Sequence, residues 1–281
     1  MRVKVGNLSF RIIGKTEELS KKLFSMFLVE EDGESCYEIR ILEEEPLEIQ
    51  GKILFQDDRV QVIEGQNDLL ETRVYRHPLT GEKFAQTKIY EDHSEAYFWP
   101  LEVNAEDWRY LYLMALALDK IAFFQHCFVL HSSSILVDGE MIVFSAPSGT
   151  GKSTQADLWN EFRGAKIING DRNLLFYREG RFYVQGWILS GSSEHRHNIC
   201  APLKAVVSLE KSPDNRVSQL KGMHALRQLH REIISNFWDR ECVDKEMDFL
   251  IHLLSEVPVL HLACRKDETA VDTLDNYLKS M

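Results

Sequence analysis

Ala146-Pro147-Ser148-Gly149-Thr150-Gly151-Lys152-Ser153-Thr154 stands near the middle of the 281-residue chain and has the spacing of a phosphate-binding loop. Four variable residues separate the small residue Ala146 from Gly151-Lys152-Ser153. The glycines let the backbone curl, so that successive N–H groups face one concavity in which an anion can lie. Lys152 is placed to reach β- and γ-phosphates, and the Ser153 hydroxyl is placed to bind Mg²⁺. The stretch therefore predicts a nucleotide phosphate site built from residues 148–154.

The residues on either side of this loop support the same interpretation. Residues 140–144 (EMIVF) are typical of a short buried strand that enters the loop. Residues 153–162 predict a helix with apolar residues on one side and Gly164 as its stop. The positive end of that helix would face the phosphates. A glycine- and serine-containing turn with no chemical role would not need this strand and helix.

The composition is that of an ordinary globular protein, with 44% hydrophobic and 27% charged residues. A balance of 33 Lys+Arg against 44 Asp+Glu, net −11, argues against general attraction to nucleic acid or anionic lipid. The five cysteines are scattered and form no C-x-x-C pair, which favours a reducing compartment. The first residues alternate apolar and polar side chains, and no apolar run is long enough to span a bilayer. We therefore expect a cytoplasmic protein without a membrane or nucleic-acid partner.

The first 100 residues are rich in predicted strands. A helix is expected over residues 17–24, with Thr16 as its N-cap. Residues 30–48 carry nine acidic side chains and one basic one, which indicates a solvated face or a dock for a basic peptide. The predicted strands are residues 4–13, 37–42, 53–55 and 60–63, followed by a hairpin of 72–76 with 84–89.

The remainder alternates strands and helices. Asn104 is expected to cap one long helix that reaches Ala122, and residues 128–136 and 140–144 to form a hairpin turning at Asp138-Gly139. The pattern indicates an α/β fold that leans to α+β, with a mixed sheet in residues 101–281 after a β-rich region in residues 1–100. The later elements are expected as strands at 165–169, 174–177, 182–185, 204–209 and 259–263, and helices at 224–238, 244–255 and from Asp267.

Three segments resemble the catalytic domain of HPr serine kinase/phosphorylase, which is related in fold to ATP-dependent phosphoenolpyruvate carboxykinase. They are Leu130-His131-Ser132-Ser133, the loop at residues 146–154, and Ile168-Asn169-Gly170-Asp171-Arg172. The likeness covers about residues 100–281. It implies a kinase that uses ATP and Mg²⁺ and phosphorylates a serine hydroxyl of a protein or peptide, and it makes a homo-oligomer plausible.

The resemblance also assigns roles to single residues. Lys152 and Ser153 match the phosphate-binding lysine and the Mg²⁺-binding hydroxyl, and His131 matches a histidine beside the reacting phosphate. The family has two consecutive aspartates at the strand end, one acting as base and one near the metal. Here the pair reads Gly170-Asp171, so Asp171 matches the second aspartate and the first is missing. Either Asp171 does both jobs or another group supplies the base.

Residues 190–198 are the most polar stretch after the loop. A planar guanidinium fits phosphate oxygens in pairs, so Arg196 is a candidate nucleotide-binding residue. Glu194 follows Asp171 at a distance similar to that of a metal-ligating glutamate in the family, which makes it a candidate metal ligand by spacing alone. A flexible surface loop is the alternative for the whole segment.

Three functions remain open from the sequence. The leading one is the serine kinase of a protein or peptide, with Asp171, His131 and Lys152 as its catalytic residues and residues 1–100 as its specificity module. A kinase of a small hydroxylated metabolite is the second. The third is a sensor or assembly protein that binds ATP without turnover, which the missing acidic partner at Gly170 keeps open.

Overall fold

The computed structural model describes every residue of the chain except 15–17, 31–34, 48 and 192. The chain divides into two compact units. The first holds residues 1–4 and 8–125, and the second holds residues 5–7 and 126–281. The β-rich first unit therefore extends beyond residue 100. No helix in the described part of the chain has the length and apolar character needed to cross a bilayer.

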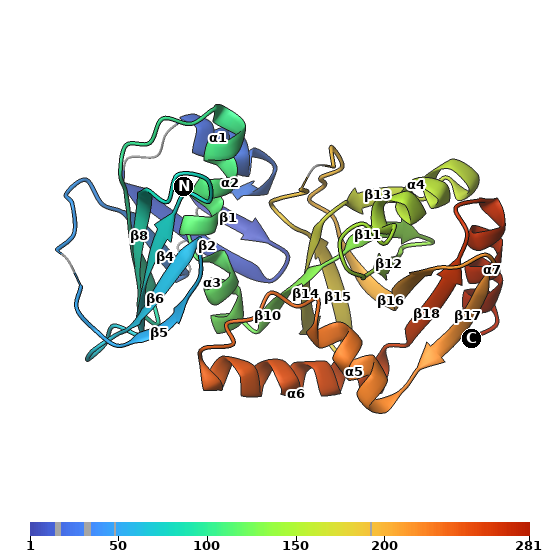
Figure 1. Ribbon diagram of the computed structural model, residues 1–281. Helices are drawn as coiled ribbons and strands as arrows, with labels where there is room; N and C mark the ends of the chain where they lie inside the picture. The colour runs from blue at the N-terminus through green and yellow to red at the C-terminus, as the bar shows by residue number, and fades with distance from the viewer. Residues whose placement is uncertain (15–17, 31–34, 48, 192) are drawn as a thin grey trace. The chain divides into compact units, whose positions relative to one another are not determined.

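The first unit is built on one mixed sheet (Figure 1). Its elements are β1 (Arg2–Val5), β2 (Leu8–Gly14), α1 (Glu18–Phe24), the 3-10 helix η1 (Ser25–Phe27), β3 (Leu28–Val29), β4 (Tyr37–Ile41), β5 (Ile53–Gln56), β6 (Val60–Glu64), β7 (Glu71–Arg76), β8 (Lys83–Ile89), β9 (His93–Phe98), α2 (Ala105–Ala115) and α3 (Leu118–Phe124). The strand order is β3-β1-β2-β4-β9-β8-β7-β6-β5. Helix α2 packs Leu111 and Ala115 against Tyr75 and Phe84 of the sheet.

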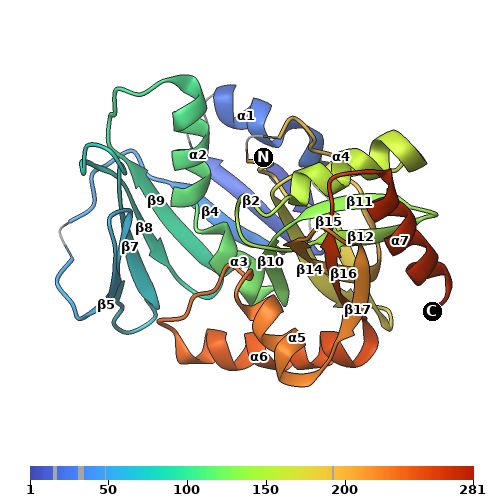
Figure 2. The ribbon, with the colours of Figure 1, turned by 45° about the vertical axis from the view of Figure 1, so that its right-hand side comes forward.

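The second unit is also a mixed sheet with helices packed on it. Its elements are β10 (Cys127–His131), β11 (Ser133–Val137), β12 (Glu140–Phe144), α4 (Lys152–Arg163), β13 (Lys166–Asn169), β14 (Arg172–Arg178), β15 (Arg181–Gly186), β16 (Cys200–Lys211), β17 (Arg216–Leu220), α5 (Gly222–His230), α6 (Arg240–Glu256), β18 (Val259–Cys264) and α7 (Glu268–Lys279). The main strand order is β10-β14-β15-β16-β12-β11-β13, and β18 pairs with β16 and β17. Helices α4 and α7 pack together, as do α5 and α6 (Figure 2).

Strand β16 lies at the centre of the parallel part of this sheet. It runs parallel to β12 along one edge and parallel to β18 along the other. The carboxyl ends of these three strands therefore lie at the same end of the sheet, which is where ligands bind in open α/β sheets. The loop before α4 follows β12 at that end, and Trp159 of α4 and Leu274 of α7 belong to the same hydrophobic core.

Several local predictions are confirmed. Strand β12 has the predicted bounds, and α4 begins one residue earlier and ends one residue later than predicted. Gly164 ends α4 in the left-handed region, with φ 64°. Asp138 and Gly139 both have positive φ, as the predicted tight hairpin requires. Asn104 caps α2, because its Oδ1 accepts a hydrogen bond from the Asp107 amide at 2.9 Å.

The single long helix predicted over residues 104–122 is wrong. The chain forms α2 and α3 instead, with Ala117 between them at φ 52°. The hydroxyl of Thr87 on β8 donates a hydrogen bond to the Ala115 carbonyl. A tertiary contact thus satisfies a carbonyl group at the end of α2, and the apolar spacing of the sequence continues across the break.

Three other predicted elements are shorter than expected. The strand at 4–13 is interrupted at Gly6, where φ is 61°, and becomes β1 and β2. The strand at 128–136 is divided at Ser132 because β10 pairs with β14 while β11 pairs with β12 and β13. The helix at 224–238 ends at His230, since the following residues pair with β10. Thr16 and Glu17, the predicted start of α1, lie outside the described residues.

Candidate functional site

The loop between β12 and α4 presents main-chain N–H groups that have no acceptor among the residues that the structure describes. Within the described chain, no acceptor bonds the amides of Gly149, Gly151, Lys152 and Ser153, whereas the Thr150 amide donates to the Pro147 carbonyl at 3.2 Å. Gly149 and Gly151 have φ values of 75° and 121°. Such a conformation turns successive amides toward one side and forms a concave anion site. The Ncap residue of α4 is Gly151, which provides no capping side chain.

Lys152 is held inside this loop. Its side chain is 7% exposed, and Nζ donates hydrogen bonds to the carbonyls of Ala146 at 2.6 Å and Pro147 at 3.5 Å. Burial lowers the pKa of the ammonium group, and the charges of Glu232 and Asp171 oppose that shift. The ammonium group thus has neutral carbonyl partners that a phosphate oxygen can replace.

His131 stands between two carboxylates. Its Nε2 lies 3.5 Å from Oδ1 of Asp171, and its Nδ1 lies 3.1 Å from Oε2 of Glu232. The His131 amide also donates to the Glu232 carbonyl at 2.8 Å, so the main chain fixes this pair as well. Glu232 is buried, whereas His131 and Asp171 are half-buried. His131 thus connects the buried Glu232 carboxylate with the half-buried Asp171 carboxylate.

The hydrogen bond with His131 holds the pKa of Asp171 below its ordinary value, burial opposes the shift, and Arg172 and Lys152 add to it. Nε of Arg172 lies 3.3 Å from the other carboxylate oxygen, Oδ2. Asp171 is therefore ionised at neutral pH. An ionised carboxylate can accept a proton or bind a cation.

Asn169 shapes the turn that carries Asp171. Its Oδ1 accepts hydrogen bonds from the amides of Asp171 and Arg172, each at 3.0 Å. Its Nδ2 donates to the carbonyls of Trp187 and Leu189 at 2.9 and 3.0 Å. The side chain of Asn169 therefore joins the end of β13 to the segment after β15. Its role is to position Asp171.

Gly170 has a steric reason to lack a side chain. A Cβ atom on Gly170 would overlap the side chain of Ser193, and a Cβ on Gly191 would come within 3 Å of the Asp171 side chain. Gly191 and Ser193 thus lie close over the turn at 170–171. Ser193 fills the space into which an aspartate at position 170 would have to extend. The family that the sequence resembles has two consecutive aspartates at this turn. The position of Ser193 leaves no room for the first of them.

Most of the predicted site residues line one pocket of about 310 Å³. Three do not. Thr150 lines a neighbouring pocket, Glu194 is exposed outside both, and Arg196 donates from Nη1 to the Ile188 carbonyl at 2.9 Å. The predicted residues in the shared pocket are His131, Ser148, Gly149, Gly151, Lys152, Ser153, Thr154 and Asp171, which Gly170, Ser190 and Ser193 join.

The donor set of this pocket fits a magnesium nucleotide better than a metal ion alone. No three His, Cys, Asp or Glu side chains of the described chain form a cluster that could hold an ion. The Ser153 hydroxyl and the Asp171 carboxylate both line the pocket. Mg²⁺ in nucleotide sites takes one or two carboxylates together with phosphate oxygens and waters. These two side chains are the ones that would hold it.

The sequence did not reveal Glu232. It lies 101 residues from its partner His131 and follows a helix whose predicted end was too late. It reaches the site because the residues after α5 pair with β10, where Ile233 forms a bridge with Leu130. No local spacing connects Glu232 with the loop, so only the tertiary pairing identifies it.

Similarity to known proteins is found among solved structures, and it is distant in sequence. No protein-family model matches the chain, and no curated protein matches it. Among solved structures, it is similar to the Hpr(Ser) kinase/phosphatase from Coxiella burnetii, with 11% sequence identity and a TM-score of 0.32. The match covers 54% of this chain and 97% of that chain. This is distant similarity, and it says nothing about substrate or cofactor.

Proposed function

We propose that this protein is an ATP- and Mg²⁺-dependent kinase that phosphorylates a serine hydroxyl of a protein or peptide. The observation that carries the proposal is the set of loop amides without acceptors in the described chain, beside Lys152 and Ser153. Amides, an ammonium group and a hydroxyl in one concavity are what a nucleotide triphosphate requires. The resemblance to HPr serine kinases supplies the acceptor class.

The chemistry follows from the groups around the pocket. Phosphoryl transfer requires positioned cations around the phosphates and a group that takes the proton of the attacking hydroxyl. Lys152 would leave the Ala146 carbonyl and bind phosphate oxygens. The serine hydroxyl would attack the γ-phosphorus as the bond to the β-phosphate oxygen breaks, and its proton would pass to the Asp171 carboxylate. Bound Mg²⁺ would neutralise charge that builds up on the phosphates.

His131 and Glu232 act on Asp171 in this proposal. Glu232 holds the His131 ring from the buried side, and His131 holds the Asp171 carboxylate at 3.5 Å. Asp171 serves as both base and magnesium ligand, because Gly170 provides no second carboxylate. The first unit, with its mixed sheet, would bind the protein or peptide that carries the serine.

A nucleotide sensor without turnover is the second candidate. It is favoured by one observation: among the described residues that line the pocket, Asp171 is the single carboxylate. A sensor would bind Mg–ATP through the same loop amides. It would not transfer the γ-phosphoryl group, and the Asp171 carboxylate would have no proton to accept.

The test measures Mg–ATP binding by calorimetry and label transfer from γ-labelled ATP to serine-containing peptides. Lys152→Met should weaken Mg–ATP binding about 10- to 100-fold, because it removes a charge-assisted contact to phosphate. Lys204→Met is the matched control, since Lys204 pairs with Glu140 at the far end of β12. Equal affinity of Lys152→Met and wild type would refute the phosphate site. Binding without any label transfer would favour the sensor.

A further inference from the structure

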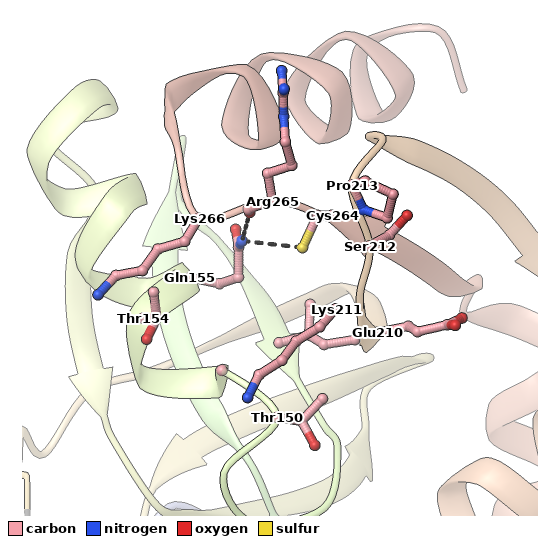
Figure 3. Close-up of a pocket in the computed structure, with 12 residues that line it drawn as sticks. Thr150, Thr154, Gln155, Glu210, Lys211, Ser212, Pro213, Cys264, Arg265 and Lys266 are labelled. Atoms are coloured by element: carbon pink, nitrogen blue, oxygen red, sulfur yellow. Dashed lines mark hydrogen bonds between the residues drawn. The ribbon is translucent and has the colours of Figure 1, made fainter.

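A second pocket, of about 590 Å³, lies beside the phosphate loop on the side of β16 and β18 (Figure 3). Its walls come from the end of the phosphate loop, the first turn of α4, the carboxyl ends of β16 and β18, and the residues that follow these two strands. Gly151 and Thr154 line this pocket and also the pocket with Asp171. A ligand whose phosphates occupy the loop can therefore extend from the first pocket into the second.

Gln155 lines this second pocket and carries a buried hydrogen-bond acceptor for which the described chain offers no donor. Its side chain is 2% exposed, and its Oε1 has no partner anywhere in the described chain. Nε2 donates to Sγ of Cys264 at 3.3 Å and to the Arg265 carbonyl at 3.5 Å (Figure 3). Only the NH2 end of the glutamine amide can donate to the Arg265 carbonyl, so Nε2 is assigned to that side and Oε1 to the other branch of the amide.

A buried amide oxygen without a donor is costly, which suggests that a ligand supplies the donor. The neighbouring thiol does not supply a reactive group. Burial raises the pKa of Cys264 to about 11, so the thiol is neutral at physiological pH and serves as a soft, weakly polar wall. Leu209 and Pro213 add apolar lining. Charged side chains also line the pocket, namely Glu210, Lys211, Arg265 and Lys266. Apolar walls with an oriented amide acceptor suit a flat heterocycle with an amino group.

We propose that this pocket binds the base of the nucleotide and that Gln155 selects adenine by accepting a hydrogen bond from its exocyclic amine. This inference rests on the proposed nucleotide function and adds the residue that decides which base is bound. A base with a carbonyl oxygen in place of the amine would bring two acceptors face to face. Such a base is rejected because both oxygens lose their donors.

The experiment compares three ligands on the full chain by calorimetry: Mg–ATP, Mg–ITP and Mg–tripolyphosphate. ITP has an oxygen in place of the adenine amine, and tripolyphosphate has no base. Wild type should bind ATP about tenfold more tightly than ITP, which corresponds to one hydrogen bond in a buried site. ATP should also bind more tightly than tripolyphosphate, since the base adds buried surface.

Gln155→Leu should bind ATP and ITP with equal affinity and leave tripolyphosphate binding unchanged. Leu has a similar volume, and Gln155→Met is a second variant with the same expected result if Leu impairs folding. Gln228→Leu on α5 is the matched control, because Gln228 lines a different pocket. It should keep the wild-type preference for ATP.

The possible failures are distinguishable. Absence of tripolyphosphate binding in wild type would overturn the phosphate site, and the proposed function and this inference with it. Tripolyphosphate binding with equal affinities for ATP and ITP in wild type would overturn the role of Gln155 alone. The same conclusion would follow if Gln155→Leu kept the tenfold preference for ATP.

Discussion

Two groups of charged side chains in this protein contain similar residues and are used differently. In the first unit, Arg73 pairs with Glu71 at 2.7 Å and with Asp119 at 3.0 Å, and Lys120 lies 4.0 Å from Glu71. We call these four residues the buried ion cluster. Arg73, Glu71 and Lys120 are at most 5% exposed. Each cation of the cluster faces a carboxylate, so the charges satisfy one another inside the fold.

The group around the phosphate loop has the opposite character. His131 and Asp171 are about one-third and one-quarter exposed, at 32% and 27%, and they line a pocket. Lys152 has carbonyl partners but no carboxylate at ion-pair distance in the described chain. Charge alone therefore does not mark a site. A site is marked by charges and amides whose partners are weak, missing or replaceable.

The largest effect is expected for Asp171→Asn. The amide cannot take the proton of the attacking hydroxyl, so the rate of phosphoryl transfer should fall about 10²- to 10⁴-fold. Mg–ATP affinity should fall by no more than about tenfold, because the loop amides and Lys152 still bind the phosphates while one magnesium ligand changes from a carboxylate to a neutral amide. Rates come from label transfer and affinities from calorimetry. A variant with wild-type turnover would show that another group is the base.

A nearly equal effect, but on stability, is expected for Arg73→Met in the buried ion cluster. This change leaves two carboxylates without their main cation and should lower the free energy of unfolding by about 3–5 kcal/mol. Denaturant unfolding measures it. Mg–ATP affinity should be unchanged in the folded variant. A large loss of affinity with unchanged stability would reverse the proposed difference between the two groups.

A smaller effect is expected for Gly170→Ala. The new methyl group overlaps the Ser193 side chain, which should cost about 1–3 kcal/mol of stability as an overpacked contact. The double variant Gly170→Ala/Ser193→Gly should regain most of that loss. The four proteins, namely the wild type, the two single variants and the double variant, form a double-mutant cycle. Their stabilities are measured by thermal or denaturant unfolding. Additive losses in the double variant would show that Ser193 does not occupy this space.

The smallest effect concerns pH. Because the folded-state pKa of Asp171 is below the ordinary 3.8, its ionised form stabilises the fold above that pH. This contribution is lost as the pH falls through the folded-state pKa. The melting temperature of wild type relative to Asp171→Asn should be constant from about pH 7 to 5 and should decrease below about 3.8. An increase of this difference on acidification would contradict the assigned direction.

Local and non-local features of the site differ in how far the sequence predicts them. The strand, loop and helix around Lys152 are encoded within about 25 consecutive residues, so spacing and apolar pattern were sufficient. Glu232 and the Ser193–Gly170 contact depend on chain segments that meet only after folding. At the break near Ala117, Thr87 of a distant strand similarly donates a hydrogen bond to the Ala115 carbonyl. In each case a tertiary hydrogen bond or contact outweighs the local pattern.

NMR of protein labelled with ¹⁵N-glycine tests most directly whether the amides of the phosphate loop bind phosphate. Gly149 and Gly151 report on the loop, and Gly180 at the tip of the β14–β15 hairpin is the internal control. Adding Mg–tripolyphosphate should shift the amide signals of Gly149 and Gly151 and leave that of Gly180 unchanged. Unmoved signals from Gly149 and Gly151 at a saturating ligand concentration would contradict the claim.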